Sequence, residues 1–420
     1  MKQRLLMVIW LCLIGIISLA PASAQPKRVF IIFTPGFWGC IDKLPSQSRQ
    51  WLEKSPYPHF KKHQNSSFLA SESYQAIPQK YLALGEGPGF SKSFIKPYAK
   101  FVTELSYWAR KVNRTEGYQK IKLIHDWQTE LSEVGEINLI FLKYDWRLEV
   151  PQVERDYVVP LLKRIEEQWP DSQWDWVGHS LGGLIGRYVV SKHPGRFRSL
   201  ISIGGPHYGI YEIGCQRRGE KIFYGNQWDL NYAQELGLKL TEQYFFGTKL
   251  VEPGLNYSRS AAEFAERYTP MMRWLDPNEG LLADGFGSLS TLKEAVPHAI
   301  AFYGLGYGSY DLQGVYHPEL PNGIGVGSGI EPKDNPDYAL SGDGRIDPVS
   351  AKGPFKQTVC LGKELQHGEL MWSPLLLTFL IDRYFFEGRM SSSQIKAVFM
   401  RRGIYWQEPI DWVLQAQKAW

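Results

Sequence analysis

The chain carries little net charge and few cysteines. Its 47 Lys and Arg residues nearly balance its 43 Asp and Glu residues, so the formal net charge of the 420 residues is only +4. A chain this close to neutral lacks the electrostatic footprint of a nucleic-acid-binding protein, and we exclude nucleic acid as a partner. No pair among its four cysteines has zinc-type spacing. We expect neither a metal nor another cofactor.

Long apolar runs are also scarce, and the most marked one lies at the start of the chain. Residues 5–19 are almost wholly apolar, two basic residues precede them, and residues 22–24 (Ala-Ser-Ala) follow. This pattern predicts a signal peptide over residues 1–24, cleaved to leave a mature chain over 25–420. An uncleaved anchor is the alternative, although the run is short for a bilayer span. We therefore expect a secreted or periplasmic protein with no transmembrane span after cleavage.

Short apolar segments alternate with amphipathic segments along the rest of the chain. We expect strands over 28–34, 137–143, 173–177, 199–203 and 299–303, and helices over 118–133, 152–168, 181–193 and beyond 372. This alternation predicts a mostly parallel sheet with helices on both faces. Two polar stretches interrupt it, and we expect insertions there, at about 40–115 and 207–295, within a single domain. Residues 304–345 are rich in Gly and Pro and predict an irregular loop.

The strongest chemical signal is the segment 178–183 (Gly-His-Ser-Leu-Gly-Gly), which follows an apolar strand and opens a helix. Glycines two positions before and two after Ser180 permit the sharp strand-to-helix turn that presents a nucleophilic serine. The positive end of the following helix would face the developing oxyanion. We predict Ser180 to be the nucleophile of a serine hydrolase with an α/β-hydrolase core. The alternative is an ordinary strand–turn–helix junction with an inert serine.

Two backbone amides are expected to bind the negative oxygen that forms when Ser180 attacks an ester. One is the N–H of Leu181, the residue after the nucleophile. The other is the N–H of Phe37, in the segment 34–39 (Thr-Pro-Gly-Phe-Trp-Gly) after the first strand. A plain Pro-Gly turn is the alternative for this segment. Trp38 either lines the acyl channel as a substrate-binding residue or simply packs.

The acid and the base are expected after the nucleophile in the chain, in that order. His367 lies just before a predicted helix, where the base belongs, and an exposed loop residue is the alternative. Two carboxylates precede it, Asp343 between two glycines and Asp347 before a proline. We expect Asp343 to orient His367 and Asp347 to be a turn or capping residue. The Gly-Asp-Gly segment lacks the ligand series of a calcium loop, so we predict no metal there.

Five segments together resemble the lecithin:cholesterol acyltransferase family, which includes lysosomal phospholipase A-type enzymes and phospholipid:diacylglycerol acyltransferases. In the family's order they are 35–39 (Pro-Gly-Phe-Trp-Gly), 144–147 (Tyr-Asp-Trp-Arg), 178–183, 303–306 (Tyr-Gly-Leu-Gly) and 342–344, with His367 following. The resemblance implies the triad Ser180, Asp343 and His367, with the amides of Phe37 and Leu181 as oxyanion donors. Asp145 and Arg147, at a strand end, can pair and brace the loops around Ser180.

The sequence also departs from this family. Arg345-Ile346 stand where the family usually has Thr-Val, and Cys40 has no partner within 41–114, where the family commonly has a disulfide. A bond from Cys40 to Cys215 is conceivable, because both follow turns near the site. These differences affect the expected lid geometry and substrate, and they leave the expected triad unchanged.

The family resemblance implies a lipid acyl hydrolase or O-acyltransferase, acting on phospholipid or other lipid esters at a membrane or lipoprotein surface. The aromatic content of 14% fits such a surface and also fits buried tryptophans. An esterase or glycolipid deacylase acting on other esters is the alternative. A non-catalytic lipid-binding protein is a remote one, since it would usually lose a triad member. The choice between hydrolase and transferase depends on how well the cap shields the acyl-enzyme from water.

Overall fold

A parallel sheet forms the centre of the molecule. The computed structural model describes residues 27–36, 91–144, 148–218, 271–279, 292, 295–307, 309–317, 342–361 and 365–401. Within them, seven strands pair in the order β2-β3-β1-β4-β5-β6-β9, and every pair is parallel. The strands are β1 (Val29–Thr34), β2 (Ile121–Ile124), β3 (Ile137–Phe141), β4 (Gln173–His179), β5 (Phe197–Ile203), β6 (His298–Tyr303) and β9 (Gln357–Cys360). The predicted parallel sheet is confirmed.

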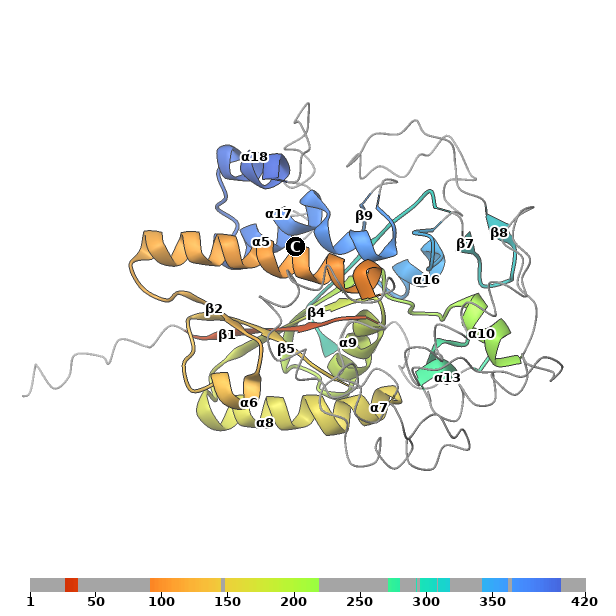
Figure 1. Ribbon diagram of the computed structural model, residues 1–420. Helices are drawn as coiled ribbons and strands as arrows, with labels where there is room; N and C mark the ends of the chain where they lie inside the picture. Colours follow the sequence, from red (N-terminus) through yellow and green to blue (C-terminus); the bar gives the residue numbers. More distant parts are fainter. Residues whose placement is uncertain are drawn as a thin grey trace, which may run out of the picture.

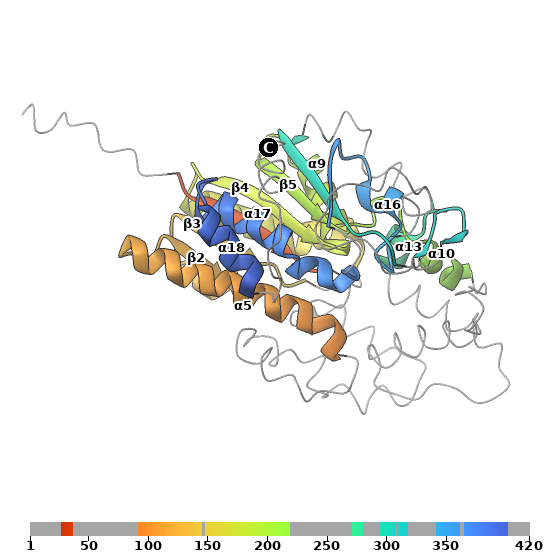
Figure 2. The ribbon, with the colours of Figure 1, turned by 90° about the horizontal axis from the view of Figure 1, so that it is seen from above.

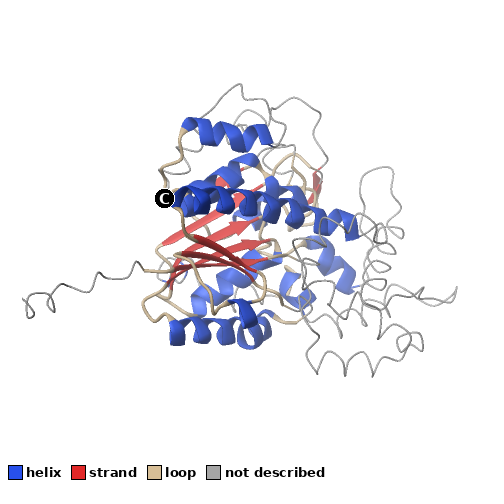
Figure 3. Cartoon of the chain, turned by 60° about the vertical axis from the view of Figure 1, so that its left-hand side comes forward, coloured by secondary structure: helices blue, strands red, loops and turns tan. Residues whose placement is uncertain are grey.

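Helices cover both faces of this sheet (Figures 1 and 3). One face carries α5 (Ser91–Glu116), α17 (Pro374–Phe385) and α18 (Ser392–Arg401), and the other carries α7 (Val150–Val153), α8 (Val159–Gln168) and α9 (Leu181–Lys192). A π-helical turn, Glu154–Val158, joins α7 to α8. The helices expected over 152–168 and 181–193 are therefore present.

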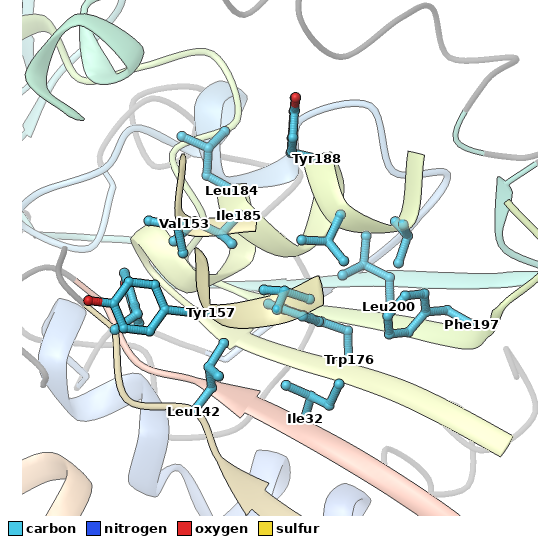
Figure 4. Close-up of a cluster of buried hydrophobic side chains, with 14 of the residues drawn as sticks. Ile32, Leu142, Val153, Tyr157, Trp176, Leu184, Ile185, Tyr188, Phe197 and Leu200 are labelled. Carbon is cyan, nitrogen blue, oxygen red and sulfur yellow. The ribbon is translucent and has the colours of Figure 1, made fainter. Parts of the chain in front are cut away.

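The strand sequences reflect this double burial. In β1, Phe30 and Ile32 pack on one face of the sheet, and Ile31 and Phe33 pack on the other. Alternate side chains of a strand point to opposite faces, so a strand covered on both sides reads as a continuous apolar run. Figure 4 shows part of the core on the α9 face, where Trp176 lies among aliphatic and aromatic side chains.

The helix expected over 118–133 is wrong. Residues 121–124 form β2, which pairs with β3 from Ile121 opposite Ile137, and only the short α6 (Trp127–Glu130) is helical. Asp126 caps α6 by accepting a hydrogen bond from the N–H of Gln128. The apolar spacing of a four-residue strand fits a helical period equally well, and pairing with β3 decides between the two.

The last part of the insertion expected at about 40–115 packs in the core of the fold. Residues 91–116 form the long helix α5, which lies along the sheet beside α17 (Figure 2). Its buried residues recur at helical spacing and pack in the core: Tyr98, Phe101, Val102, Leu105, Trp108, Ala109 and Val112. Pro97 lies inside this helix and masks its period in the sequence, because proline usually ends a helix.

Shorter elements gather beyond the carboxyl ends of the central strands, on the right in Figures 1 and 2. They are α10 (Tyr211–Arg218), α13 (Met271–Leu275), α16 (Pro348–Lys352) and a two-stranded hairpin of β7 (Ser309–Tyr310) and β8 (Tyr316–His317). The hairpin adds local order to the stretch expected to be irregular. Among the described residues, no helix combines the length and the apolar character that a bilayer span requires.

Candidate active site

Ser180 lies on the turn between β4 and α9, in a strained conformation. Its φ of 54° and ψ of −126° place it where residues with a Cβ atom are rarely found. A Cβ atom added to Gly178 would lie 2.2 Å from the Gly182 oxygen, and one added to Gly182 would lie 2.0 Å from the Thr34 oxygen. Both flanking glycines are therefore required for the turn to form. The N–H of Ser180 donates to the Ile203 oxygen at 2.8 Å, which fixes the turn to β5.

The turn that follows β1 packs directly against this serine. A Cβ atom added to Gly36 would lie 2.5 Å from the Ser180 Cβ, so only glycine permits this approach. The Tyr144 hydroxyl donates to the Pro35 oxygen at 2.7 Å and holds the same turn. Leu181 is the first residue of α9, a position whose N–H has no acceptor within its own helix. Two amide-bearing segments therefore flank Ser180.

Several predicted residues lie outside those that the structure describes. They include Phe37 and Trp38 after the β1 turn, Asp145 and Arg147 after Tyr144, and Cys40. Their expected roles stay predictions. Cys215, the conceivable partner of Cys40, is buried in α10.

Asp343 and His367 are in direct contact. The His367 Nδ1–H donates to Asp343 Oδ2 at 2.7 Å, and the backbone N–H of His367 donates to the backbone carbonyl oxygen of Asp343 at 2.9 Å. The other carboxylate oxygen, Oδ1, accepts from the N–H groups of Arg345 and Ile346 at 3.0 and 2.8 Å. The side chain is 1% exposed. Both oxygens of Asp343 are thus occupied, so the carboxylate is fixed in orientation and the imidazole is held as the Nδ1–H tautomer.

Glycines at the ends of β5 and β6 bring this pair to the same end of the sheet as Ser180. A Cβ atom added to Gly204 would lie 3.2 Å from both Asp343 Oδ2 and His367 Cε1, and one added to Gly304 would lie 2.9 Å from the Asp343 Cβ. The ring of His179, the residue before the nucleophile, lies 4.9 Å from the His367 ring between centroids. In parallel α/β sheets the carboxyl ends of the strands are where active sites form.

Asp347 is the N-cap of α16, as its position before a proline predicted. Its Oδ1 accepts hydrogen bonds from the N–H groups of Val349 and Ser350 at 2.9 and 3.1 Å. Burial raises the pKa of Asp347 to about 6, although these two hydrogen bonds oppose the shift. The structure therefore gives the two neighbouring carboxylates different partners, a backbone cap for Asp347 and the His367 ring for Asp343.

Two other histidines have partners of their own. His207 is fully buried, and its Nε2 lies 2.7 Å from the Ser202 hydroxyl. His193, at the far end of α9 from Ser180, is partly buried with its Nε2 2.7 Å from Glu154 Oε1. Within the part of the chain that the structure describes, no three side chains of metal-binding type come together.

Glu212, on α10, is a further carboxylate close to the Asp343 loop that the sequence did not single out. Its Oε2 is buried, and the described residues supply it with no hydrogen-bond partner. Burial raises the pKa of Glu212 to about 7, and the negative charges of Asp347 and Asp343 add to the shift. Arg345 acts in the opposite direction. Ionisation of Glu212 is therefore unfavourable in the folded protein.

This shift predicts a pH effect on stability. The unfolded carboxyl titrates near 4.5 and the folded one near 7. The folded state thus holds a proton that the unfolded chain has lost, and stability falls as pH rises from about 4.5 to 7. Glu212→Gln cannot ionise. Between pH 5 and pH 8 its free energy of unfolding should gain about 2 kcal/mol relative to wild type, measured by urea denaturation. Glu133→Gln, at an exposed carboxylate, is the control, and an unchanged pH dependence in Glu212→Gln contradicts the prediction.

Two residues at the site were given no role by the sequence. The one signal in the sequence for a role of His179 was its position between the predicted nucleophile and the flanking glycine. Tyr98 lies on α5, a segment expected to be an insertion, and nothing in the sequence relates it to Ser180. Both are buried, and the Tyr98 hydroxyl lies 2.6 Å from His179 Nδ1.

A match to a known protein family agrees with this architecture. A protein family described as alpha/beta hydrolase fold matches residues 147–229, and no curated protein matches the chain. Phospholipase PlaB from Legionella pneumophila in complex with thio-NAD aligns with a TM-score of 0.28 at 12% identity, over 66% of this chain and 38% of that one. The lin2722 gene product from Listeria innocua aligns with a TM-score of 0.34 at 11% identity, over 87% of this chain and 96% of that one. The chain thus spans well under half the length of PlaB. It has the α/β-hydrolase fold, as predicted.

Proposed function

We propose that this α/β-hydrolase is an exported serine hydrolase or O-acyltransferase that cleaves the acyl esters of lipids. The observation that carries the proposal is the setting of Ser180. Ser180 is strained and only 7% exposed, the Gly36 turn packs against it, and the hydrogen-bonded Asp343–His367 pair lies at the same carboxyl end of the sheet. Strain of this kind costs about 1–3 kcal/mol, and proteins retain it where function requires it.

The proposed reaction begins with proton transfer. His367 Nε2 accepts the Ser180 proton while Ser180 Oγ attacks the carbonyl carbon of the ester. The amides of Leu181 and Phe37 donate to the resulting oxyanion. His367 then gives the proton to the departing alcohol, and the acyl group stays on Ser180. Asp343 keeps its charge throughout and stabilises the imidazolium that forms between the two steps.

A second alcohol or water completes the cycle. His367 takes a proton from the acceptor, the acceptor oxygen attacks the acyl carbon, and the proton passes back to Ser180 Oγ as the ester bond breaks. Water gives a free fatty acid, and a lipid or sterol hydroxyl gives a new ester. The lipid substrate is supported by the resemblance of the segments around Ser180, Asp343 and His367 to the lecithin:cholesterol acyltransferase family. Residues outside the described part of the chain are proposed to form the cap, with Trp38 on the acyl channel.

Product analysis tests the substrate class. Purified mature protein is incubated with vesicles of mixed membrane phospholipids, with and without sterol, and the lipids are analysed by mass spectrometry. We expect free fatty acid together with lysolipid, or an acylated sterol or lipid if the acceptor is an alcohol. Protein inactivated beforehand with a fluorophosphonate is the matched control and should give neither product. Activity on short soluble esters with no cleavage of vesicle lipid would overturn the lipid assignment and indicate an esterase for other substrates.

A further inference from the structure

A largely buried chain of hydrogen bonds runs through His179, the residue before Ser180, and joins the turn after β1 to His367. The N–H of Gly36 lies 2.8 Å from the Tyr98 hydroxyl, which lies 2.6 Å from His179 Nδ1. On the other side of the same ring, His179 Nε2 lies 3.0 Å from the backbone oxygen of His367. The chain thus starts at the turn after β1 and ends at the residue that carries the proposed base.

The two ends of this chain, together with a neutral His179, determine the direction of every hydrogen bond in it. A backbone N–H can only donate and a backbone carbonyl can only accept. His179 Nε2 must therefore carry a proton and donate it to the His367 oxygen. Its Nδ1 then accepts the Tyr98 hydroxyl proton, and the Tyr98 oxygen accepts from Gly36. A single arrangement satisfies all the donors and acceptors, with His179 neutral.

The surroundings of His179 keep it in that state. The side chain is buried, and burial lowers its pKa well below the usual value, with the nearby His367 acting in the same direction. The hydrogen bond to the His367 carbonyl opposes this shift and does not outweigh it. If His179 were protonated, Nδ1 would carry a proton and would donate to the Tyr98 oxygen. The Tyr98 hydroxyl proton would then lose its acceptor on His179.

We propose that Tyr98 and His179 are positioning residues, which hold the Gly36 turn and the backbone of His367 in a fixed relative position next to Ser180. This inference rests on the proposed function, because Tyr98 and His179 touch neither substrate nor the reacting atoms. They can affect the reaction only by positioning groups that take part in it. The proposed reaction needs the N–H of Phe37, which follows Gly36, at the ester oxygen while the His367 ring takes the Ser180 proton. A rigid link between their backbones fixes that geometry before substrate arrives.

The main test is Tyr98→Phe, which removes one hydroxyl and keeps the ring. It breaks the links to Gly36 and to His179 together, and kcat on a soluble p-nitrophenyl ester should fall about 10- to 100-fold, with a smaller change in KM. Each rate is divided by the concentration of Ser180 that a fluorophosphonate titrates. A purely structural role would lower the titrated fraction and leave the rate per titrated site unchanged.

Two substitutions of His179 test separately its hydrogen bond to Tyr98 and its hydrogen bond to the His367 backbone oxygen. The amide of His179→Asn reaches the Nδ1 position, and the amide of His179→Gln reaches the Nε2 position. Each should lower kcat per titrated site. Adding His179→Gln to Tyr98→Phe should lower it no further than Tyr98→Phe alone, because both changes break the same bond. These variants also keep the test decisive if Tyr98→Phe does not fold.

The matched control is Tyr384→Phe. Tyr384 is another buried tyrosine of the same core cluster, and its hydroxyl lies near Asp175 and Ser199, toward the opposite end of the sheet from Ser180. Its rate per titrated site should equal that of wild type. Wild-type rates per site in Tyr98→Phe and in both His179 variants would overturn this inference alone. A wild-type protein that the fluorophosphonate does not label would overturn the proposed function and this inference with it.

Discussion

Replacing Ser180 with alanine should reduce ester hydrolysis to the background rate, a loss in kcat of about five to six orders of magnitude. Alanine has no Oγ to attack the ester carbonyl, so no acyl-enzyme can form. The fold should persist, since alanine keeps the Cβ atom that packs against Gly36 and accepts the same positive φ as serine. Initial rates on a p-nitrophenyl ester and on phospholipid vesicles measure the loss, and thermal unfolding measures the stability.

The matched control for this change lies on the helix that Ser180 opens. Ser191, near the opposite end of α9 from Ser180, donates its hydroxyl to the Arg187 backbone oxygen at 2.8 Å. Ser191→Ala should keep the wild-type rate. Residual activity above roughly 1% in Ser180→Ala, once contamination by wild type is excluded, would mean that the nucleophile lies elsewhere.

Asp343→Asn should lower kcat about 10⁴-fold while the loop around it stays folded. Asp343 Oδ1 accepts from the N–H groups of Arg345 and Ile346, and an asparagine must turn its oxygen toward the same two donors. Its NH₂ group then faces His367 Nδ1, which has to become an acceptor. The ring proton moves to Nε2, and His367 can no longer take the Ser180 proton. The wrong tautomer, and not a lost charge alone, is the expected cause.

Steady-state kinetics with active-site titration measure this effect. Asp347→Asn is the paired control, because Asp347 is a buried carboxylate on the same loop that caps α16 and does not contact His367. Asparagine caps a helix as well as aspartate does, so kcat should stay near that of wild type. If Asp343→Asn retains kcat within tenfold of wild type, Asp343 does not orient the base.

Most features predicted correctly from the sequence are encoded by neighbouring residues. The turn at Ser180 follows from glycines two positions away on each side, and the cap at Asp347 follows from the adjacent proline. The contact between Asp343 and His367 was expected from the order of the motifs along the chain. Other contacts between distant residues left no such pattern. The Tyr98–His179 hydrogen bond joins residues that are 81 positions apart. Tyr98 lies on α5, whose helical period in the sequence Pro97 obscured. The strand β2 was misread because its pairing with β3, and not its own four residues, determines its conformation.

The hydrogen bond between Gly36 and Tyr98 also closes a loop of the chain, because these residues are 62 positions apart. The two ends of the intervening stretch are held at one point beside the nucleophile, whatever lies between them. Doubling the length of a flexible closed loop costs only about 0.6 kcal/mol in closure entropy. A change in the length of the chain between Gly36 and Tyr98 therefore need not move Ser180. In this scaffold, the length of that stretch can evolve separately from the geometry around Ser180.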